Sequence, residues 1–147
     1  MAPTQTSEDN PESMAAELAL GVGHLLRRLR AQADASGLGL SQLSAMARLE
    51  QHGTMTTADL ARAESMKPQS MGALLAGLEK DGLIERRPHP TDGRQILFAL
   101  TVSGSEERRQ RTTAKRAWLA GAIARLTREE RRILAAAMPL IKKLGDS

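Results

Sequence analysis

Apolar residues recur at three- and four-residue intervals near both ends of the chain, which is typical of amphipathic helices. The first run predicts a helix from residue 13 to about 35, ended by Gly37 and Gly39. Near the other end we expect a helix over 103–125, with Ser103 and Glu106 as its capping box, and a last helix opened by Thr127. Pro139 should kink or break that last helix near residue 135.

The middle of the chain carries stronger boundary signals. We expect a helix from an N-cap at Ser41 to about residue 53, then a short helix over 57–63 with Thr56 as its N-cap and Asp59 in its first turn. After a turn at 64–67, Pro68 suits the first position of a helix that runs to Lys80.

Two β-compatible segments follow, at 83–87 and 95–101, joined by a loop rich in proline and glycine. Alternation predicts an inward face made by Ile96, Phe98 and Leu100. Helix, turn, helix and hairpin form the order of a winged helix-turn-helix. We therefore predict a mainly α fold of six helices with one small β-hairpin.

The domain organisation follows from these elements. Residues 1–12 contain two prolines and many small polar residues, and we expect a disordered arm there. Residues 13–147 are predicted to form a single domain, with the winged helix-turn-helix lobe at 41–102. The apolar stripes of the flanking helices, 13–35 and 103–147, are wider than one small winged domain can cover. They are predicted to be dimerisation helices, and burial within one chain is the alternative.

Composition narrows the chemistry. The 147 residues include no cysteine, which excludes disulfides and thiol chemistry. The three histidines have no metal-ligand spacing, and no nucleophile, base and acid arrangement stands out. We expect no metal, no cofactor and no enzymatic activity. Neither an export leader nor a long apolar segment is evident, so we expect a cytoplasmic protein and no membrane contact.

The net charge of +4 is unevenly distributed along the chain. Arg86, Arg87 and Arg94 gather in the hairpin, where they could meet a phosphate backbone. Arg94 is the best candidate for a cation placed in a minor groove, and Asp92 could hold its guanidinium by a charged hydrogen bond. The alternative is an ordinary solvated ion pair.

Three segments together resemble the multiple-antibiotic-resistance regulator (MarR) family, over about residues 40–105. They are Leu78-Glu79-Lys80-Asp81-Gly82-Leu83-Ile84-Glu85-Arg86-Arg87, Pro90-Thr91-Asp92-Gly93-Arg94 and Leu100-Thr101-x-x-Gly104. The resemblance implies a homodimeric transcriptional regulator, usually a repressor. Such a protein binds a near-palindromic double-stranded DNA operator and is often released by a small aromatic or lipophilic effector.

On this resemblance the recognition helix is 68–80, and its outward face offers Gln69, Ser70 and Ala73 to DNA, with Lys67 as a phosphate contact. His89, by its place in the hairpin loop, could also touch phosphate. The family commonly has arginine where this chain has Ala73 and Gly77. Base readout by charge is therefore reduced, which favours readout of DNA shape or, alternatively, a winged-helix module that contacts protein instead of DNA. The resemblance makes Arg28, Met46 and His52 the candidates for an effector site.

Overall fold

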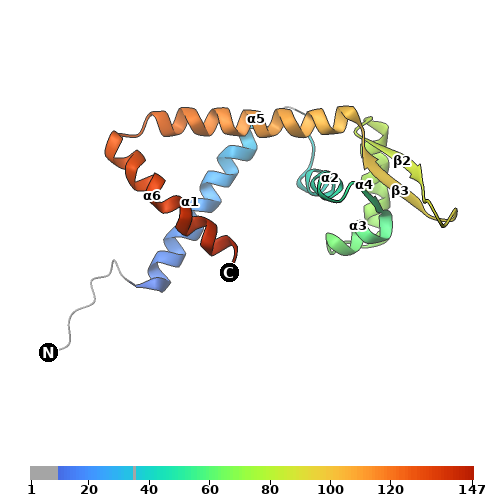
Figure 1. Cartoon of the computed structure of the whole chain (residues 1–147), viewed down its shortest axis with the longest axis horizontal. Helices are drawn as coiled ribbons and strands as arrows, with labels where there is room; N and C mark the ends of the chain where they lie inside the picture. The colour runs from blue at the N-terminus through green and yellow to red at the C-terminus, as the bar shows by residue number, and fades with distance from the viewer. Residues whose placement is uncertain (1–9, 35) are drawn as a thin grey trace. The chain divides into compact units, whose positions relative to one another are not determined.

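The computed structural model describes residues 10–34 and 36–147, and in them the chain forms six helices and a three-stranded sheet. It divides into two compact units. The winged unit comprises the described residues of 34–113, and the helical unit comprises the described residues of 1–33 together with 114–147. The boundary lies inside helix α5 (Val102–Ala124), eleven residues beyond the end of the lobe predicted at 41–102. Figure 1 shows the elements of each unit.

The winged unit begins with helices α2 (Leu40–His52), α3 (Thr57–Ala63) and α4 (Pro68–Lys80). Two predicted starts are confirmed. Thr56 Oγ1 accepts the Asp59 N–H at 3.1 Å, and Pro68 occupies the first turn of α4. The predicted N-cap at Ser41 is wrong, because α2 starts at Leu40 and its N-cap is Gly39, two residues earlier than predicted. The side chain of Gln42 reaches back and accepts the Gly39 N–H at 3.0 Å.

The sheet has the order β1-β3-β2, so β3 (Ile96–Leu100) is its central strand. Strand β1 (Thr54–Thr56), which lies between α2 and α3 in the chain, was not predicted. It pairs antiparallel with β3. Strand β2 (Ile84–Pro88) pairs with the other edge of β3, and the two form the wing. Pairing on both edges changes the predicted inward face: Ala99 is buried, whereas Ile96 remains 43% exposed near the wing loop.

A single hydrophobic core lies in the winged unit. Side chains from α2, α3, α4 and the sheet meet there, and the largest of them have no more than 2% of their surface exposed. They are Met46, Leu49, Leu60, Met71, Leu75, Leu78 and Ile84. The faces of α2, α3 and α4 that are buried in this core are the ones that their apolar spacing predicts. The opposite face of α4 does not contribute to the core.

The first turn of α5 is fixed to the start of the wing. Thr101 Oγ1 donates to the Gly82 carbonyl at 2.6 Å and accepts the Gly104 N–H at 3.0 Å, while the Thr101 N–H donates to the Leu83 carbonyl at 3.1 Å. The predicted capping box of Ser103 with Glu106 is therefore wrong, and Thr101 takes the capping position. Glu106 instead accepts hydrogen bonds from Arg109 and Gln110, and the pair with Arg109 lowers the pKa of Glu106 to about 2.

The helical unit contains α1 (Pro11–Gln32), the last part of α5 and α6 (Arg128–Gly145). Neither α1 nor α6 buries any residue. Helix α1 begins two residues before the predicted start, because Asn10 Oδ1 accepts the Glu12 N–H at 3.0 Å and Pro11 suits the first turn. Residues 10–12 of the predicted arm therefore belong to this helix start, and residues 1–9 lie outside the described part.

Helix α6 confirms one prediction about its start and corrects one about its interior. Thr127 and Glu130 form the predicted capping box, with hydrogen bonds of 2.7 and 3.2 Å. Pro139 does not break the helix, which runs on to Gly145. One proline removes a single backbone donor. The helical spacing of apolar and charged residues continues on both sides of Pro139, so the helix continues through it. No helix in the described residues is long and apolar enough to cross a membrane.

Candidate nucleic-acid interface

The outward face of α4 carries the residues expected to contact DNA bases. Gln69, Ser70 and Ala73 are exposed, and so is Lys67 at the N-cap position. Met71, Leu75 and Leu78 on the opposite side are buried, which fixes the rotation of the helix about its axis. The face therefore combines one amide and one hydroxyl with small residues, and its only charge at this end is the Lys67 ammonium.

The turn between α3 and α4 is held by a polar cluster that the sequence analysis missed. Glu64 accepts hydrogen bonds from Arg48 Nε at 2.8 Å and from Ser44 Oγ at 2.7 Å. Arg48 also donates to the Ala63 carbonyl at 3.2 Å. These two side chains lower the pKa of Glu64, whose side chain is only 14% exposed. The partners are 16 and 20 residues away, so no local pattern could reveal the cluster.

Two of the three wing arginines have acidic partners. Arg86 donates to Glu79 at 2.8 Å and lies 5.6 Å from the centre of the Phe98 ring. Arg87 forms an ion pair of 2.8 Å with Glu85. The expectation that positive charge accumulates in the hairpin is corrected here, because Glu79 and Glu85 balance these two arginines. Arg86 thereby also links the end of α4 to the wing.

Asp92 does not hold the Arg94 guanidinium, which is a second correction. Its Oδ1 accepts the backbone N–H of Arg94 at 3.0 Å, and its Oδ2 accepts the side-chain amide of Gln95 at 3.2 Å. A carboxylate that turns back to the N–H two residues later stabilises a tight loop. Asp92 therefore shapes the wing loop, and Arg94 forms no ion pair with any residue of 10–34 or 36–147.

A shallow groove connects the loop end of the wing to the start of α3. Arg94, Gln95 and Ile96 line it from the wing, and Thr56, Thr57, Ala58, Asp59 and Arg62 line it from the helix. Arg62 is bound to Asp59 at 3.2 Å and is 78% exposed, and it was not among the residues predicted to contact DNA. The groove brings two guanidinium groups to one surface of the winged unit.

The wing loop also contains His89, which is half-buried. Its Nδ1 lies 3.1 Å from the backbone nitrogen of Asp92 and 3.3 Å from that of Thr91. The expected phosphate contact at His89 is therefore limited to the other ring nitrogen.

The three residues expected at an effector site have different surroundings. Arg28 is exposed in the helical unit, and its guanidinium carbon lies 5.9 Å from the centre of the Trp118 ring. His52 is exposed at the end of α2. Met46 is completely buried in the core of the winged unit. Its role there is packing, so the prediction that it lines an effector site is corrected. Within the described residues no three His, Asp or Glu side chains are grouped to hold a metal ion.

Comparison with known proteins matches the winged unit to one family model, MarR family, over residues 38–96. The HTH-type transcriptional regulator Mb0904 of Mycobacterium bovis, itself uncharacterised, is 41% identical over 94% of this chain and 96% of its own length. The HTH-type transcriptional repressor Mb2911 of the same organism is 31% identical over 85% of this chain and 94% of its own.

Solved structures agree with the sequence relatives. A crystal structure of a protein from Pseudomonas aeruginosa is 34% identical and superposes with a TM-score of 0.81, covering 97% of this chain and 99% of the other. The arrangement of α2, α3, α4 and the wing is thus a winged helix-turn-helix, as the sequence predicted. The chain belongs to the MarR family.

Proposed function

We propose that this protein is a homodimeric repressor that binds a near-palindromic DNA operator in the cytoplasm and acts by occluding a promoter. In this proposal the exposed face of α4 enters the major groove, and Arg94 reaches the adjacent minor groove or backbone. The relatives named as HTH-type regulators, one of them a repressor, support the same function.

The observation that supports the proposal most strongly is that Arg94 has no acidic partner among the described residues. It is the wing arginine that no carboxylate of the described chain neutralises, and it sits on a loop braced by Asp92. A narrow minor groove has an enhanced negative potential that attracts such a cation. Because α4 offers Gln69 and Ser70 but no arginine on its outward face, we expect DNA shape and backbone contacts to supply a large share of the affinity.

Salt-titrated DNA binding tests this assignment. The operator is first selected from random DNA, and the affinity is then measured at several salt concentrations. Arg94→Ala should weaken binding and reduce the slope of log affinity against log salt by about 2, because each protomer of the dimer loses one phosphate contact. Arg132→Ala is the charge-matched control, since Arg132 lies in α6 and is 82% exposed beside Glu129. Equal salt slopes for the two variants would contradict the wing assignment.

The same experiment separates the alternative function. A winged-helix module that contacts protein instead of DNA is favoured by the small, nearly uncharged face of α4 at Gly72, Ala73, Ala76 and Gly77. Such a module would select no discrete sequence from random DNA and would protect no site in footprinting.

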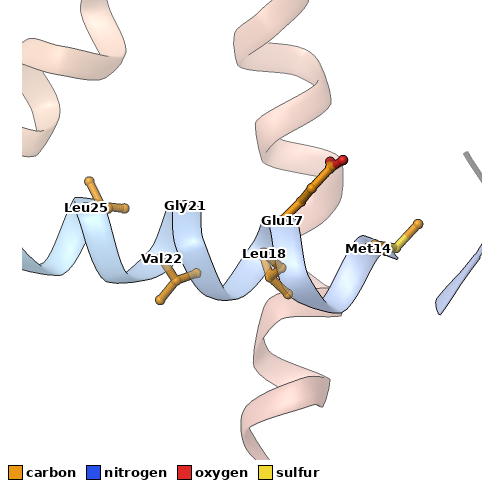
Figure 2. A pocket seen from close by; sticks show the side chains of 6 residues that line it. All are labelled: Met14, Glu17, Leu18, Gly21, Val22 and Leu25. Atoms are coloured by element: carbon orange, nitrogen blue, oxygen red, sulfur yellow. The ribbon is translucent and has the colours of Figure 1, made fainter. Parts of the chain in front are cut away.

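The dimer in this proposal is formed by the helical unit. Helix α1 exposes Met14, Leu18, Val22 and Leu25 along an apolar groove, shown in Figure 2, and α6 exposes Ile133, Leu140, Ile141 and Leu144. A second copy burying these side chains would set the spacing of two recognition helices, which must be about 34 Å to enter successive major grooves. Exposed apolar faces of this kind mark interaction surfaces.

Release by a small aromatic or lipophilic effector completes the proposal. Arg28 over the Trp118 ring offers a cation beside an aromatic face, a combination suited to an aromatic carboxylate. Trp118 is the single tryptophan of the chain and therefore reports directly on binding there. Benzoate should change its fluorescence and weaken operator binding, and an unchanged fluorescence signal would remove Arg28 from the proposal.

A further inference from the structure

The wing loop has an internal support in the imidazole of His89, at the point where β2 ends. We propose that His89 is a positioning residue for the wing: its neutral ring holds the loop that presents Arg94, and protonation of the ring releases the loop and weakens DNA binding. The effect on DNA binding rests on the proposed function, whereas the state of the ring can be measured without DNA.

The protonation state of the ring follows from the two atoms that face Nδ1. Both are backbone nitrogens, of Thr91 at 3.3 Å and of Asp92 at 3.1 Å, and a backbone N–H can only donate. Nδ1 must therefore carry its lone pair, and the single ring proton must lie on Nε2. The hydroxyl of Thr91, 3.4 Å from Nδ1, can donate to the same lone pair but does not require another tautomer.

The support continues from His89 to Arg94 through one residue. The Asp92 N–H is bound by His89, and the Asp92 carboxylate in turn accepts the Arg94 N–H at 3.0 Å and the Gln95 side-chain amide at 3.2 Å. The imidazole of His89 is thus connected through Asp92 to both Arg94 and Gln95 by hydrogen bonds. When Nδ1 gains a proton it becomes a donor, so two backbone N–H groups lose their acceptor and face a cation.

Charged groups around the ring do not offer it a replacement partner. On β2, Arg87 is paired with Glu85 at 2.8 Å. On the loop itself, Asp92 is already engaged by two donors. The β3 residues opposite Arg87 and Pro88 are Leu97 and Ile96, which carry no charge. A protonated ring would therefore have to compete with these existing partners for a carboxylate.

Nitrogen NMR of the histidine rings in the full-length protein tests the first half of the proposal. At pH 8.0 the His89 signals, assigned with a His89→Asn variant, should have the shifts of the tautomer with the proton on Nε2. A proton on Nδ1, or an even mixture of the two tautomers, would overturn the proposal whether or not the protein binds DNA.

Operator affinity at pH 8.0 and pH 5.0 tests the second half, because histidines change charge between these values. His89→Asn is the informative variant: its Oδ1 can take the place of Nδ1 and accept an N–H two residues on, but it does not titrate. His89→Ala removes the acceptor at both pH values. His24 and His52 are present in all three proteins, so their contributions cancel when the variants are compared.

The proposal expects the affinity of wild type, divided by that of His89→Asn, to be about fivefold lower at pH 5.0 than at pH 8.0, the effect of losing about one net hydrogen bond. His89→Ala should be weaker than His89→Asn at both pH values. If wild type instead gains affinity relative to His89→Asn between pH 8.0 and pH 5.0, His89 acts as a cation toward phosphate and the proposal is wrong. Identical pH profiles would overturn it as well. A failure of all three proteins to bind any DNA would contradict the proposed function but not the tautomer.

Discussion

The winged unit and the helical unit differ in where their apolar side chains lie. The winged unit buries seven large side chains almost completely, including Leu75 at 0% exposure. In the helical unit α1 and α6 bury none, and Leu140 and Leu144 are 62% and 59% exposed. Burial of apolar surface is the main favourable term in folding. The winged unit therefore contains its own source of stability, whereas the helical unit leaves apolar side chains exposed, which the proposed dimer would bury.

Leu75→Ala should give the largest effect, because it opens a cavity in the core of the winged unit. We expect the free energy of unfolding to fall by about 4 kcal/mol. The loss should be the same at every protein concentration, since the core belongs to one chain. Chemical denaturation at two concentrations measures it, and a concentration-dependent loss would contradict the self-contained core.

Gly104→Ala should be nearly as damaging. A Cβ built at Gly104 would overlap the Leu83 carbonyl oxygen, so the start of α5 must move away from the wing. We expect a loss of about 3 kcal/mol. Gly121→Ala on the same helix is the matched control, since a Cβ there meets no atom within 4 Å and should instead stabilise by about 1 kcal/mol. Thermal unfolding of both variants checks the contrast.

Leu18→Asp tests the partner surface of the helical unit. It places a charge on the apolar groove of α1, and Leu20→Asp makes the same change at a site that is 74% exposed and does not line that groove. Sedimentation should show that Leu18→Asp is monomeric and Leu20→Asp dimeric. Operator affinity should fall by about a hundredfold for Leu18→Asp, because the two recognition helices no longer bind together. Two dimeric variants would remove α1 from the interface.

Glu64→Gln should give the smallest effect, and one that depends on pH. Arg48 and Ser44 lower the pKa of Glu64 below its ordinary value of 4.5. The ionised Glu64 therefore stabilises the folded state above pH 4.5. This contribution is lost as the pH falls through the lowered pKa of Glu64 in the folded state. Near pH 7 the variant should be less stable by about 1 kcal/mol, and the difference from wild type should shrink in acid.

Denaturation of the Glu64 variant at pH 7 and pH 3 measures this effect. Glu129→Gln in α6 is the comparison from the helical unit, because the Glu129 side chain is 66% exposed and its contact with Arg132 is 3.8 Å. Exposed pairs of this kind contribute little, so its stability should match wild type at both pH values. A larger effect at Glu129 than at Glu64 would contradict the contrast between the two units.

Local signals predicted most of the fold. Thr56, Pro68 and the pair of Thr127 with Glu130 mark helix starts through contacts within three residues, and all three are confirmed. The missed or wrong features depend on residues far apart in the chain. Strand β1 exists because Thr54–Thr56 meets residues 97–99, and Thr101 caps α5 because Gly82, nineteen residues earlier, accepts its hydroxyl.

The candidate site follows the same rule. The exposed face of α4 was predictable, because helical spacing alone separates Gln69, Ser70 and Ala73 from the buried stripe. The partners of the charged residues were not. Glu64 is bound from α2, and Arg86 is bound by Glu79, so charge counted along the sequence overstated the positive character of the wing. Asp92 was correctly placed beside Arg94, but it binds the backbone and not the guanidinium.

The hydrogen bonds of Thr101 to Gly82 and Leu83 have a consequence for how the wing can move. They join the two ends of the hairpin at its base. Because Thr101 also caps α5, β2 and β3 cannot separate at this end unless the first turn of α5 loosens as well. Amide hydrogens at Thr101 and Gly104 should consequently exchange with solvent slowly, at the rate at which the whole hairpin opens. Exchange at the loop residues beyond Pro88 should be faster, and the motion of the wing is then confined to the segment that carries Arg94.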